Sequence, residues 1–152
     1  MDRAIQIRPF TIHDQTAARA LILGGLGEHF GFIDETLNPD LDDITASYLA
    51  SGHLFLVAEQ QQTLVGTGAL LLQPAATGQI VRVSTHPIYR RLGIARAICQ
   101  QLIEHARQLG LHTLIVETNR NWHDALKLYQ DLGFQQYTRD DVSSYLGMDL
   151  DK

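Results

Sequence analysis

The sequence predicts an α/β protein with one mixed β-sheet, and three features of the chain support this fold class. Two apolar segments joined by a short polar turn, at residues 54–72, are typical of a hairpin. A strand, a long amphipathic helix and a second strand follow over residues 80–118, the pattern of a right-handed parallel crossover. A length of 152 residues suffices for one domain with a sizeable core.

The N-terminal third is expected to form a short strand and two helical segments. Residues 5–9 form the strand, which a proline ends. Thr11 and Asp14 have the spacing of a capping box, which predicts a helix start. Glycines at positions 24, 25 and 27 predict a bend between two pieces of that helix. A second helix is expected over about residues 41–51.

The middle of the chain supplies three expected strands. Residues 54–58 are apolar and predict a strand, three glutamines predict a turn, and residues 64–72 predict the second strand of the hairpin. Gly66 and Gly68 are expected to weaken the middle of the return strand. The third strand covers residues 80–85, with Arg82 on the face opposite to its two valines.

The C-terminal half predicts two helices and three strands. Apolar residues recur at three- and four-residue steps, which predicts a helix from about Arg90 to about Leu109, ended by Gly110. Cys99 lies on the apolar face and is expected to be a buried small side chain rather than a nucleophile. The remaining expected elements are a strand over 114–118, a helix over 122–132 capped by Asn121 and Gly133, and strands over 134–138 and 142–149.

Composition narrows the class of protein. The net charge of -5 and the pI of about 5.7 argue against a nucleic-acid-binding domain, which is usually basic. A single cysteine allows no internal disulfide, and neither a signal segment nor an apolar run of about 20 residues is present. We therefore expect a cytoplasmic protein. The seven histidines are scattered, so no metal site is expected.

The six residues Arg90-Arg91-Leu92-Gly93-Ile94-Ala95 carry the strongest functional signal. They open the long helix, whose N-terminus has unpaired N–H groups and a partial positive charge. Arg90, Arg91 and Arg96 add three cations where structure alone would favour a polar cap and carboxylates. An anion with several charged oxygens removes the conflict, and Gly93 lets the backbone approach it closely. The segment therefore predicts a phosphate or pyrophosphate site.

Two other interpretations of this segment stay open. The arginines can be solvated on an uncapped surface helix, since each charge near a helix end is worth only about 0.3–1 kcal/mol. They can also pair with carboxylates of a partner, in which case the domain is an interaction module. Two common phosphate motifs, the nucleotide triphosphatase loop and the dinucleotide-binding glycine pattern, are absent from the sequence.

Two separated motifs make the chain similar to a known family. They are Arg90-x-x-Gly93-x-Ala95 and, after a helix and a strand, Ala125-x-x-x-Tyr129-x-x-x-Gly133-Phe134. In this order they resemble the pyrophosphate loop and a later signature of the GNAT superfamily of acyl-CoA-dependent N-acyltransferases. The resemblance implies a mostly antiparallel sheet of about seven strands with a parallel, splayed central pair, flanked by about four helices. It also implies one N-acetyltransferase domain over residues 1–152, with acceptor-side helices at 11–51 and an acetyl-CoA-binding core at 79–138.

The resemblance implies acetyl-CoA as cosubstrate and an amine as acceptor. The strand before the loop would pair its backbone with the pantetheine arm, and the loop would hold the pyrophosphate. A homodimer is compatible with the resemblance, whereas nucleic acid and membrane partners are not expected. The implied cofactor-binding residues are Arg82, Val83, Ser84, Thr85, Arg90, Arg91, Leu92, Gly93, Ile94, Ala95, Arg96, Asn121 and Tyr129.

Acyl transfer to an amine needs a base, a donor to the developing oxyanion and an acid for the departing thiolate. A free amine has a pKa of about 10.4, so only about one molecule in a thousand is neutral at pH 7, and a base contributes substantially. A backbone N–H near Val83 is the candidate oxyanion donor. The resemblance assigns the acid to Tyr129, whose ordinary pKa of about 10 keeps it protonated. A core tyrosine bonded to the backbone is the alternative.

The catalytic base is the open assignment. Many family members carry Glu on the strand before the loop, near the position of Gln79, which cannot take a proton. Glu117 on the adjacent strand is the first substitute for this base. The alternative is that its carboxylate has a purely structural role. Ser84, His86 and His123 are weaker options, because the His86-Pro87 pair is expected to be turn structure. Water acting with backbone carbonyls is a further one.

The acidic stretch from residue 28 to residue 43 provides a hypothesis about the acceptor. If part of it faces the acceptor, its carboxylates favour a cationic amine; a solvated loop with Asp40 or Asp42 as a helix cap is the alternative. The expected function is transfer of an acetyl group to a primary amine of a small molecule or protein by direct attack. A domain that holds acyl-CoA as a sensor, without turnover, is the competing function.

Overall fold

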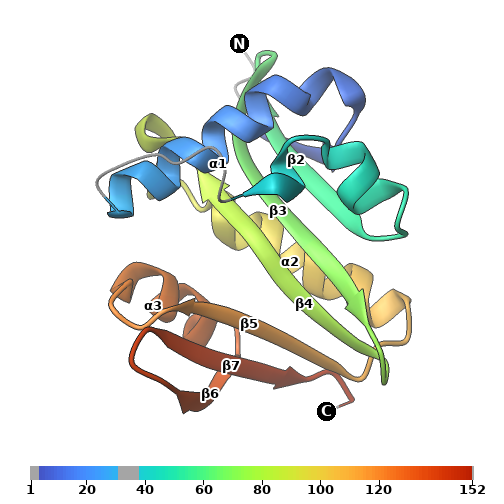
Figure 1. Cartoon of the computed structure of the whole chain (residues 1–152), viewed down its shortest axis with the longest axis vertical. Coiled ribbons are helices and arrows are strands. Elements are labelled where there is room, and N and C mark those ends of the chain that lie inside the picture. Colours follow the sequence, from blue (N-terminus) through green and yellow to red (C-terminus); the bar gives the residue numbers. More distant parts are fainter. Residues whose placement is uncertain (1–3, 31–37, 152) are drawn as a thin grey trace.

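A single mixed sheet forms the centre of the protein (Figure 1). The computed structural model describes residues 4–30 and 38–151. Across these residues the strand order is β1-β2-β3-β4-β5-β7-β6. The strands are β1 (Gln6–Pro9), β2 (Leu54–Gln60), β3 (Thr63–Gln73), β4 (Thr77–Thr85), β5 (Thr113–Asn119), β6 (Gln135–Arg139) and β7 (Ser143–Asp149).

All neighbouring strands pair antiparallel except β4 and β5, which are parallel. The helix α2 (Ile94–Gln108) connects these two strands, as the crossover pattern predicts. The β4–β5 ladder runs from Thr77 and Thr113 to Ile80 and Val116. The predicted mostly antiparallel sheet with a parallel, splayed central pair is therefore confirmed.

Helical elements cover both faces of the sheet and create two apolar cores (Figure 1). On one face, α1 (Gln15–Phe30) and the short turns η2 (Pro39–Leu41) and η3 (Thr45–Leu49) pack on β2 and β3. On the other face, α2 and α3 (His123–Asp131) pack on the sheet. Two further short turns are η1 (Ile12–Asp14) and η4 (Pro87–Tyr89).

The helical segments of residues 11–51 differ from the prediction in two ways. The first helix is not divided into two pieces, because α1 runs unbroken through its glycines. A Cβ on Gly25 would lie 3.4 Å from Ser84 Oγ, so this glycine lets the helix approach β4 closely instead of breaking it. In place of a helix over residues 41–51 there is η2 followed by the single π-turn η3, in which Ala50 N–H donates to Thr45 O. A wider turn of this kind has no periodicity that a sequence window would detect.

Two helix starts also need correction. The long helix begins at Ile94 rather than Arg90, with Gly93 at its N-cap. The last helix has Trp122 rather than Asn121 as N-cap, because Asn121 instead donates its N–H to Asn119 Oδ1 at 2.9 Å. Its other end is confirmed, since Gly133 follows the last turn with φ +108°.

Gly66 and Gly68 have a packing role that the sequence does not reveal. A Cβ on Gly66 would lie 2.7 Å from Ile94 Cγ2, and one on Gly68 would lie 2.5 Å from Ile98 Cγ2. Both distances are below any ordinary contact, so α2 can lie this close to β3 only because these two positions lack side chains. The glycines thus fix where the start of α2 sits on the sheet.

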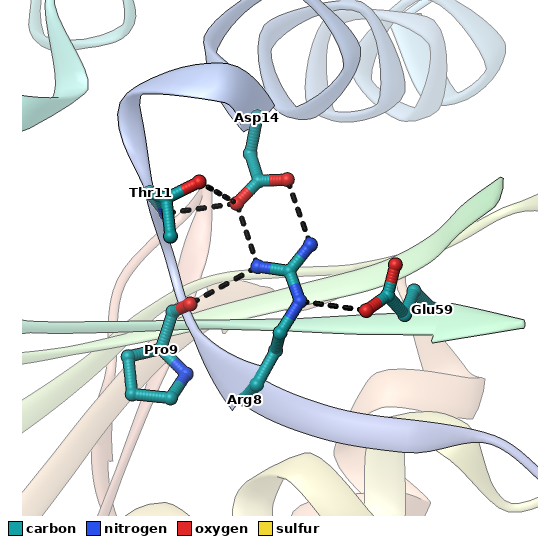
Figure 2. Close-up of polar contacts among 5 residues, drawn as sticks. All are labelled: Arg8, Pro9, Thr11, Asp14 and Glu59. Atoms are coloured by element: carbon teal, nitrogen blue, oxygen red, sulfur yellow. Dashed lines mark hydrogen bonds and ion pairs between the residues drawn. The ribbon is translucent and has the colours of Figure 1, made fainter. Parts of the chain in front are cut away.

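A network around Arg8 fastens the N-terminal strand to the sheet (Figure 2). The guanidinium donates to both carboxylate oxygens of Asp14, at 2.8 and 2.9 Å, and to Glu59 Oε1 at 2.7 Å. Asp14 also accepts the backbone N–H of Thr11 at 2.8 Å, as the predicted capping box requires. Hydrogen bonding from Arg8 lowers the pKa of the Asp14 carboxyl.

Within the ranges that the structure describes, no helix has both the length and the apolar character needed to span a bilayer.

Candidate active site

The two central strands separate in the middle of the sheet. Their last parallel pair is Ile80 with Val116, yet β4 continues to Thr85 and β5 to Asn119 (Figure 1). Beyond that pair β4 remains bonded to β3, and β5 remains bonded to β7. The edges of β4 and β5 that face each other are therefore free to bond to something other than one another.

An irregularity in β4 lies at the same place. Thr67 pairs with Ser84 and Ala69 pairs with Val81, so Arg82 and Val83 together oppose the single residue Gly68. This is a β-bulge, and Arg82 has the left-handed value φ +57°. The hydroxyl of Thr67 donates to the carbonyl oxygen of Arg82 at 2.8 Å.

A pocket of about 600 Å³ opens on the α1 side of this region. It takes side chains from β3, β4 and β5 and from the turns η2 and η3. Its lining residues are Asp40, Ser47, Tyr48, Leu71, Val81, Arg82 and Glu117.

An ion-pair network forms one wall of the pocket. Arg82 Nε and Nη2 donate to the two carboxylate oxygens of Asp40 at 3.0 and 2.6 Å, and Tyr48 donates its hydroxyl to Asp40 Oδ2 at 2.6 Å. Burial disfavours the charged carboxylate, but the hydrogen bonds from Arg82 and Tyr48 outweigh it and lower the pKa of Asp40. Burial and the Asp40 charge together raise the pKa of Tyr48 to about 12. The network therefore stays in one charge state across the neutral range.

Glu117 lies on the opposite side of the pocket, on β5. Its side chain is exposed, and its Oε2 accepts the Ser143 hydroxyl at 2.9 Å. The structure thus brings Glu117 and Arg82, two of the sequence-predicted site residues, into one pocket. The backbone of the other predicted residues of β4, Val83, Ser84 and Thr85, lies on the separated part of that strand.

The arginine-rich loop lies partly outside the helix to which the sequence assigned it. Arg90 and Arg91 precede α2, and only Arg96 lies in its first turn, where Nη2 is 3.5 Å from Asp131 Oδ2. Arg91 and Gly93 both have left-handed φ, +64° and +80°, and a Cβ on Gly93 would have no atom within 4 Å. The positive charge at the N-terminus of α2 is therefore less crowded than the sequence suggests.

The same loop can accommodate an anion. Ala97 N–H donates to Gly93 O, so the N–H groups of Ile94, Ala95 and Arg96 have no helical carbonyl available to them. Leu92 is 63% exposed, and the space beside Gly93 is open. Left-handed residues such as Arg91 and Gly93 can turn neighbouring N–H groups toward one concave side, which suits a phosphate group.

Tyr129 lies in the core on the α2 side. It is 6% exposed, and its ring packs against Phe134 with centroids 5.8 Å apart. Across the described residues its hydroxyl has no hydrogen-bond partner, and no fully enclosed side-chain oxygen or nitrogen lacks one. The hydroxyl therefore borders accessible space, and the backbone-bonded alternative does not apply. Burial, with a smaller contribution from Cys99, raises the pKa of Tyr129, so the hydroxyl stays protonated.

The structure also places Gln79 and the weaker candidate bases Ser84, His86 and His123. Gln79 lies in the paired part of β4 and accepts the Gln73 amide at 2.6 Å. His86 accepts the N–H of Ile88 through Nδ1 and contacts Tyr89, which confirms the expected turn. Ser84 Oγ faces α1 near Gly25. His123 and Asn121 are exposed at the start of α3.

In the acidic stretch from residue 28 to residue 43, three aspartates make ionic or hydrogen-bonded contacts, and the other acidic side chains lie outside the described residues. Asp40 binds Arg82, Asp42 lies 3.5 Å from Arg19, and Asp43 accepts the N–H of Ala46. The expected caps at Asp40 and Asp42 are therefore wrong, because both carboxylates bind arginines and Asp43 is the one that bonds to a helical N–H. The side chains of Glu28 and His29, and all of Asp34 and Glu35, lie outside the described residues.

Other predicted features concern single residues. Cys99 is fully buried, as expected, and burial raises the pKa of its thiol to about 12. In the part of the chain that the structure describes, no three His, Cys, Asp or Glu side chains gather as a metal site would require.

Sequence reasoning missed two residues of this region and the partner of a third. Tyr48 and Thr67 carried no signal, because an aromatic and a β-branched residue in apolar segments read as ordinary core. Asp40 was one of several acidic residues, with nothing to connect it to Arg82, which is 42 positions away. A covarying pair at positions 40 and 82 in an alignment is the signal that would have connected them.

Known proteins share this sequence pattern and this fold. The chain matches the acetyltransferase (GNAT) family over residues 26–134. It is 34% identical over 111 residues to human N-acetyltransferase 8B, covering 69% of this chain and 49% of that protein. The chain thus spans about half the length of the curated relatives it matches.

Solved structures resemble the fold along almost the whole chain. A GNAT-family acetyltransferase from Staphylococcus aureus has a TM-score of 0.89 at 23% identity and covers 97% of this chain and 99% of its own. PaiA N-acetyltransferase from Thermoplasma acidophilum, solved in complex with coenzyme A, has a TM-score of 0.84 at 17% identity and covers 96% and 99%. Both likenesses concern the fold. Taken with the sequence match, they confirm the resemblance of the two motifs: the chain belongs to the acetyltransferase (GNAT) family.

Proposed function

We propose that the protein is an N-acetyltransferase that moves an acetyl group from acetyl-CoA to a primary amine of a small molecule or protein by direct attack, with residues 1–152 acting as one domain. The observation that carries the proposal is the separation of β4 and β5 beyond Ile80 and Val116, beside an open loop at Gly93. A strand edge that can accept a further strand therefore lies close to a helix start that can hold an anion. Family membership supports the reaction class.

Acetyl-CoA supplies the acetyl group as an activated thioester. The loop 90–96 would hold its pyrophosphate through the N–H groups of Leu92 to Arg96, with Arg90 and Arg91 beside the phosphates. The free edge of β4 from Arg82 to Thr85 would bond the pantetheine arm as an added strand. Asn121, at the start of α3, would border the other side.

Three groups of this chain are assigned chemical roles. The N–H of Val83 donates to the carbonyl oxygen as negative charge develops on it. Tyr129 gives a proton to the departing sulfur, because burial keeps its hydroxyl protonated. Glu117 takes the proton from the amine, directly or through water, because its exposed carboxylate lines the pocket. The acceptor enters through that pocket, on the α1 side of the sheet.

Turnover of acetyl-CoA with a broad set of amines tests the proposal. Release of free thiol together with an acetylated product, identified by mass, is the expected result. Binding of coenzyme A without thiol release for any amine would identify a sensor instead of an enzyme. Absence of both binding and turnover at millimolar thioester would contradict the whole assignment and favour an interaction module.

Variants of the two proposed proton-transfer residues test their roles. Tyr129→Phe and Glu117→Gln are each expected to lower kcat about 10²-fold, the usual size of a general acid or base contribution. Tyr137→Phe is the matched control, since that tyrosine is 61% exposed on β6. A Tyr129→Phe enzyme that equals the parent would remove Tyr129 from the mechanism.

A further inference from the structure

We propose that Thr67 is a positioning residue that aims the N–H of Val83 into the gap between β4 and β5. The proposal rests on the proposed function, in which that N–H meets the carbonyl oxygen of the thioester. Thr67 lies on β3 and need not touch the substrate. It acts through the Arg82–Val83 peptide, which its hydroxyl holds in one orientation.

At the bulge, the peptide between Arg82 and Val83 needs contacts that fix its orientation. Arg82 has φ +57°, a left-handed conformation that is strained for a residue with a side chain. The register shift removes the regular ladder partners at this point of β4. Without another contact, the peptide between Arg82 and Val83 would be free to rotate toward the ordinary extended conformation. Two contacts oppose that rotation.

The first contact fixes the main chain. Thr67 Oγ1 donates to Arg82 O at 2.8 Å, so this carbonyl points toward β3. In a trans peptide the carbonyl and the next N–H point in opposite directions. The structure contains no cis peptide among its described residues. The N–H of Val83 therefore points away from β3, toward the edge of β4 that β5 has left.

The burial of Thr67 makes the contact specific. Its side chain is fully buried among apolar strand residues, where an unpaired hydroxyl would be costly. The carbonyl of Arg82 is the acceptor that satisfies it. Valine has the same shape and would suit an apolar strand equally well, so packing gives no reason for a hydroxyl at this position.

The second contact fixes the side chain of Arg82. Two hydrogen bonds from its guanidinium to Asp40 fix the Arg82 side chain on the α1 side of the sheet. The Tyr48 hydroxyl donates a further hydrogen bond to Asp40. The pair connects the turn η2 to the bulge, so the wall of the pocket and the orientation of the Val83 amide depend on each other. Thr67 and Asp40 thus hold the same residue, Thr67 through the Arg82 main chain and Asp40 through the Arg82 side chain.

Replacement of the hydroxyl by a methyl group tests the proposal. Thr67→Val is expected to lower kcat at least tenfold and at most by the factor of about 10²–10³ that follows loss of one oxyanion donor, while the KM for acetyl-CoA changes little. Thr67→Ser should restore kcat because it returns the hydroxyl. Thr63→Val, an exposed threonine of the same strand, is the matched control.

A measurement on the free protein tests the geometry without turnover. Loss of the hydrogen bond should move the carbonyl ¹³C resonance of Arg82 and the amide resonance of Val83 in Thr67→Val, and Thr67→Ser should return both. Unmoved resonances, or a shifted carbonyl with unchanged kcat, would overturn the proposal. If the parent protein turns over no amine, the proposed function fails while this spectrum still decides the orientation.

A second variant covers the case in which Thr67→Val does not fold. Asp40→Asn removes the charged fork from a turn at the surface and is expected to move the same two resonances and to lower kcat at saturating acceptor. If Asp40→Asn folds with the parent's resonances and kcat, the peptide needs no anchoring and the proposal is wrong.

Discussion

Arg8 shows how a single partly buried cation can hold a terminal strand in place. It donates to carboxylates from two different elements, Asp14 in η1 and Glu59 in β2 (Figure 2). Asp14 is the more dependent partner, because its side chain is only 9% exposed and its carboxylate also accepts the N–H of Thr11. Loss of either group would leave the other charge without its bidentate partner.

Asp14→Asn is expected to lower the free energy of unfolding at pH 7 by about 1–3 kcal/mol, the usual worth of hydrogen bonds to a charged group. The pKa of Asp14 lies below its ordinary value of 3.8 in the folded protein, so the pair stabilises the fold above about pH 4. This stabilisation is lost as pH falls through the folded pKa. The difference between parent and variant, measured by urea unfolding at several pH values, should therefore shrink in acid.

A matched surface change serves as the control for that variant. Asp42→Asn removes a carboxylate that is 62% exposed and 3.5 Å from Arg19. It is expected to change stability by less than about 0.5 kcal/mol, because exposed ion pairs contribute little. If the difference in free energy of unfolding between the parent and Asp14→Asn stays constant down to pH 2, the carboxylate charge is not the stabilising feature.

At the scale of elements, the packing of α2 on β3 decides where the candidate site lies. The helix begins beside Gly66 and Gly68, and its first buried residue, Ile94, occupies the space over Gly66. The loop that would hold the pyrophosphate is the segment just before that contact. The position of the loop over the separated strands therefore follows from two glycines in a neighbouring strand.

Gly68→Ala is expected to destabilise the protein by about 1–3 kcal/mol, because its Cβ would lie 2.5 Å from Ile98 Cγ2 and α2 would have to move. Thermal unfolding measures the change. Gly24→Ala is the matched control: nothing lies within 4 Å of its Cβ in helix α1, and alanine should stabilise the helix by about 0.5–1 kcal/mol. Equal effects of the two substitutions would contradict the packing argument.

At the scale of the whole molecule, the sheet consists of two antiparallel parts joined by one short parallel ladder. β1 to β4 form one part, and β5, β7 and β6 form the other. A ligand that bonds β4 and also reaches α3 would connect the two parts at the point where they separate. Binding and global stability should therefore be coupled.

Coenzyme A at about 100 times its Kd is expected to add about 2.7 kcal/mol to the free energy of unfolding, which raises Tm by about 5–10 °C for a chain of this size. Gly93→Ala should remove most of the increase, because φ +80° is strained for any residue with a Cβ and relaxation would move the loop amides. A thermal shift assay compares the two proteins. An equal rise in both would place the ligand away from this loop.

The sequence by itself determined most of the types of element and the family. Apolar periodicity located every strand of the sheet to within a few residues, and the two motifs around Gly93 and Tyr129 indicated the family. These features are local, since they depend on residues within one turn or one strand of each other. Local signals failed at the ends of helices and at the π-turn η3, where contacts with the sheet decide the backbone conformation.

Only the tertiary structure decided how the site is assembled. The bulge at Arg82, the separation of β4 and β5, and the pairing of Arg82 with Asp40 all join segments that lie far apart in the chain. The sequence predicts that the backbone of Arg82 binds the cofactor, and the structure adds that its side chain lines the pocket together with Asp40 and Tyr48. Strand register and long-range ion pairs depend on which surfaces pack together, and a linear pattern of residues does not contain that information.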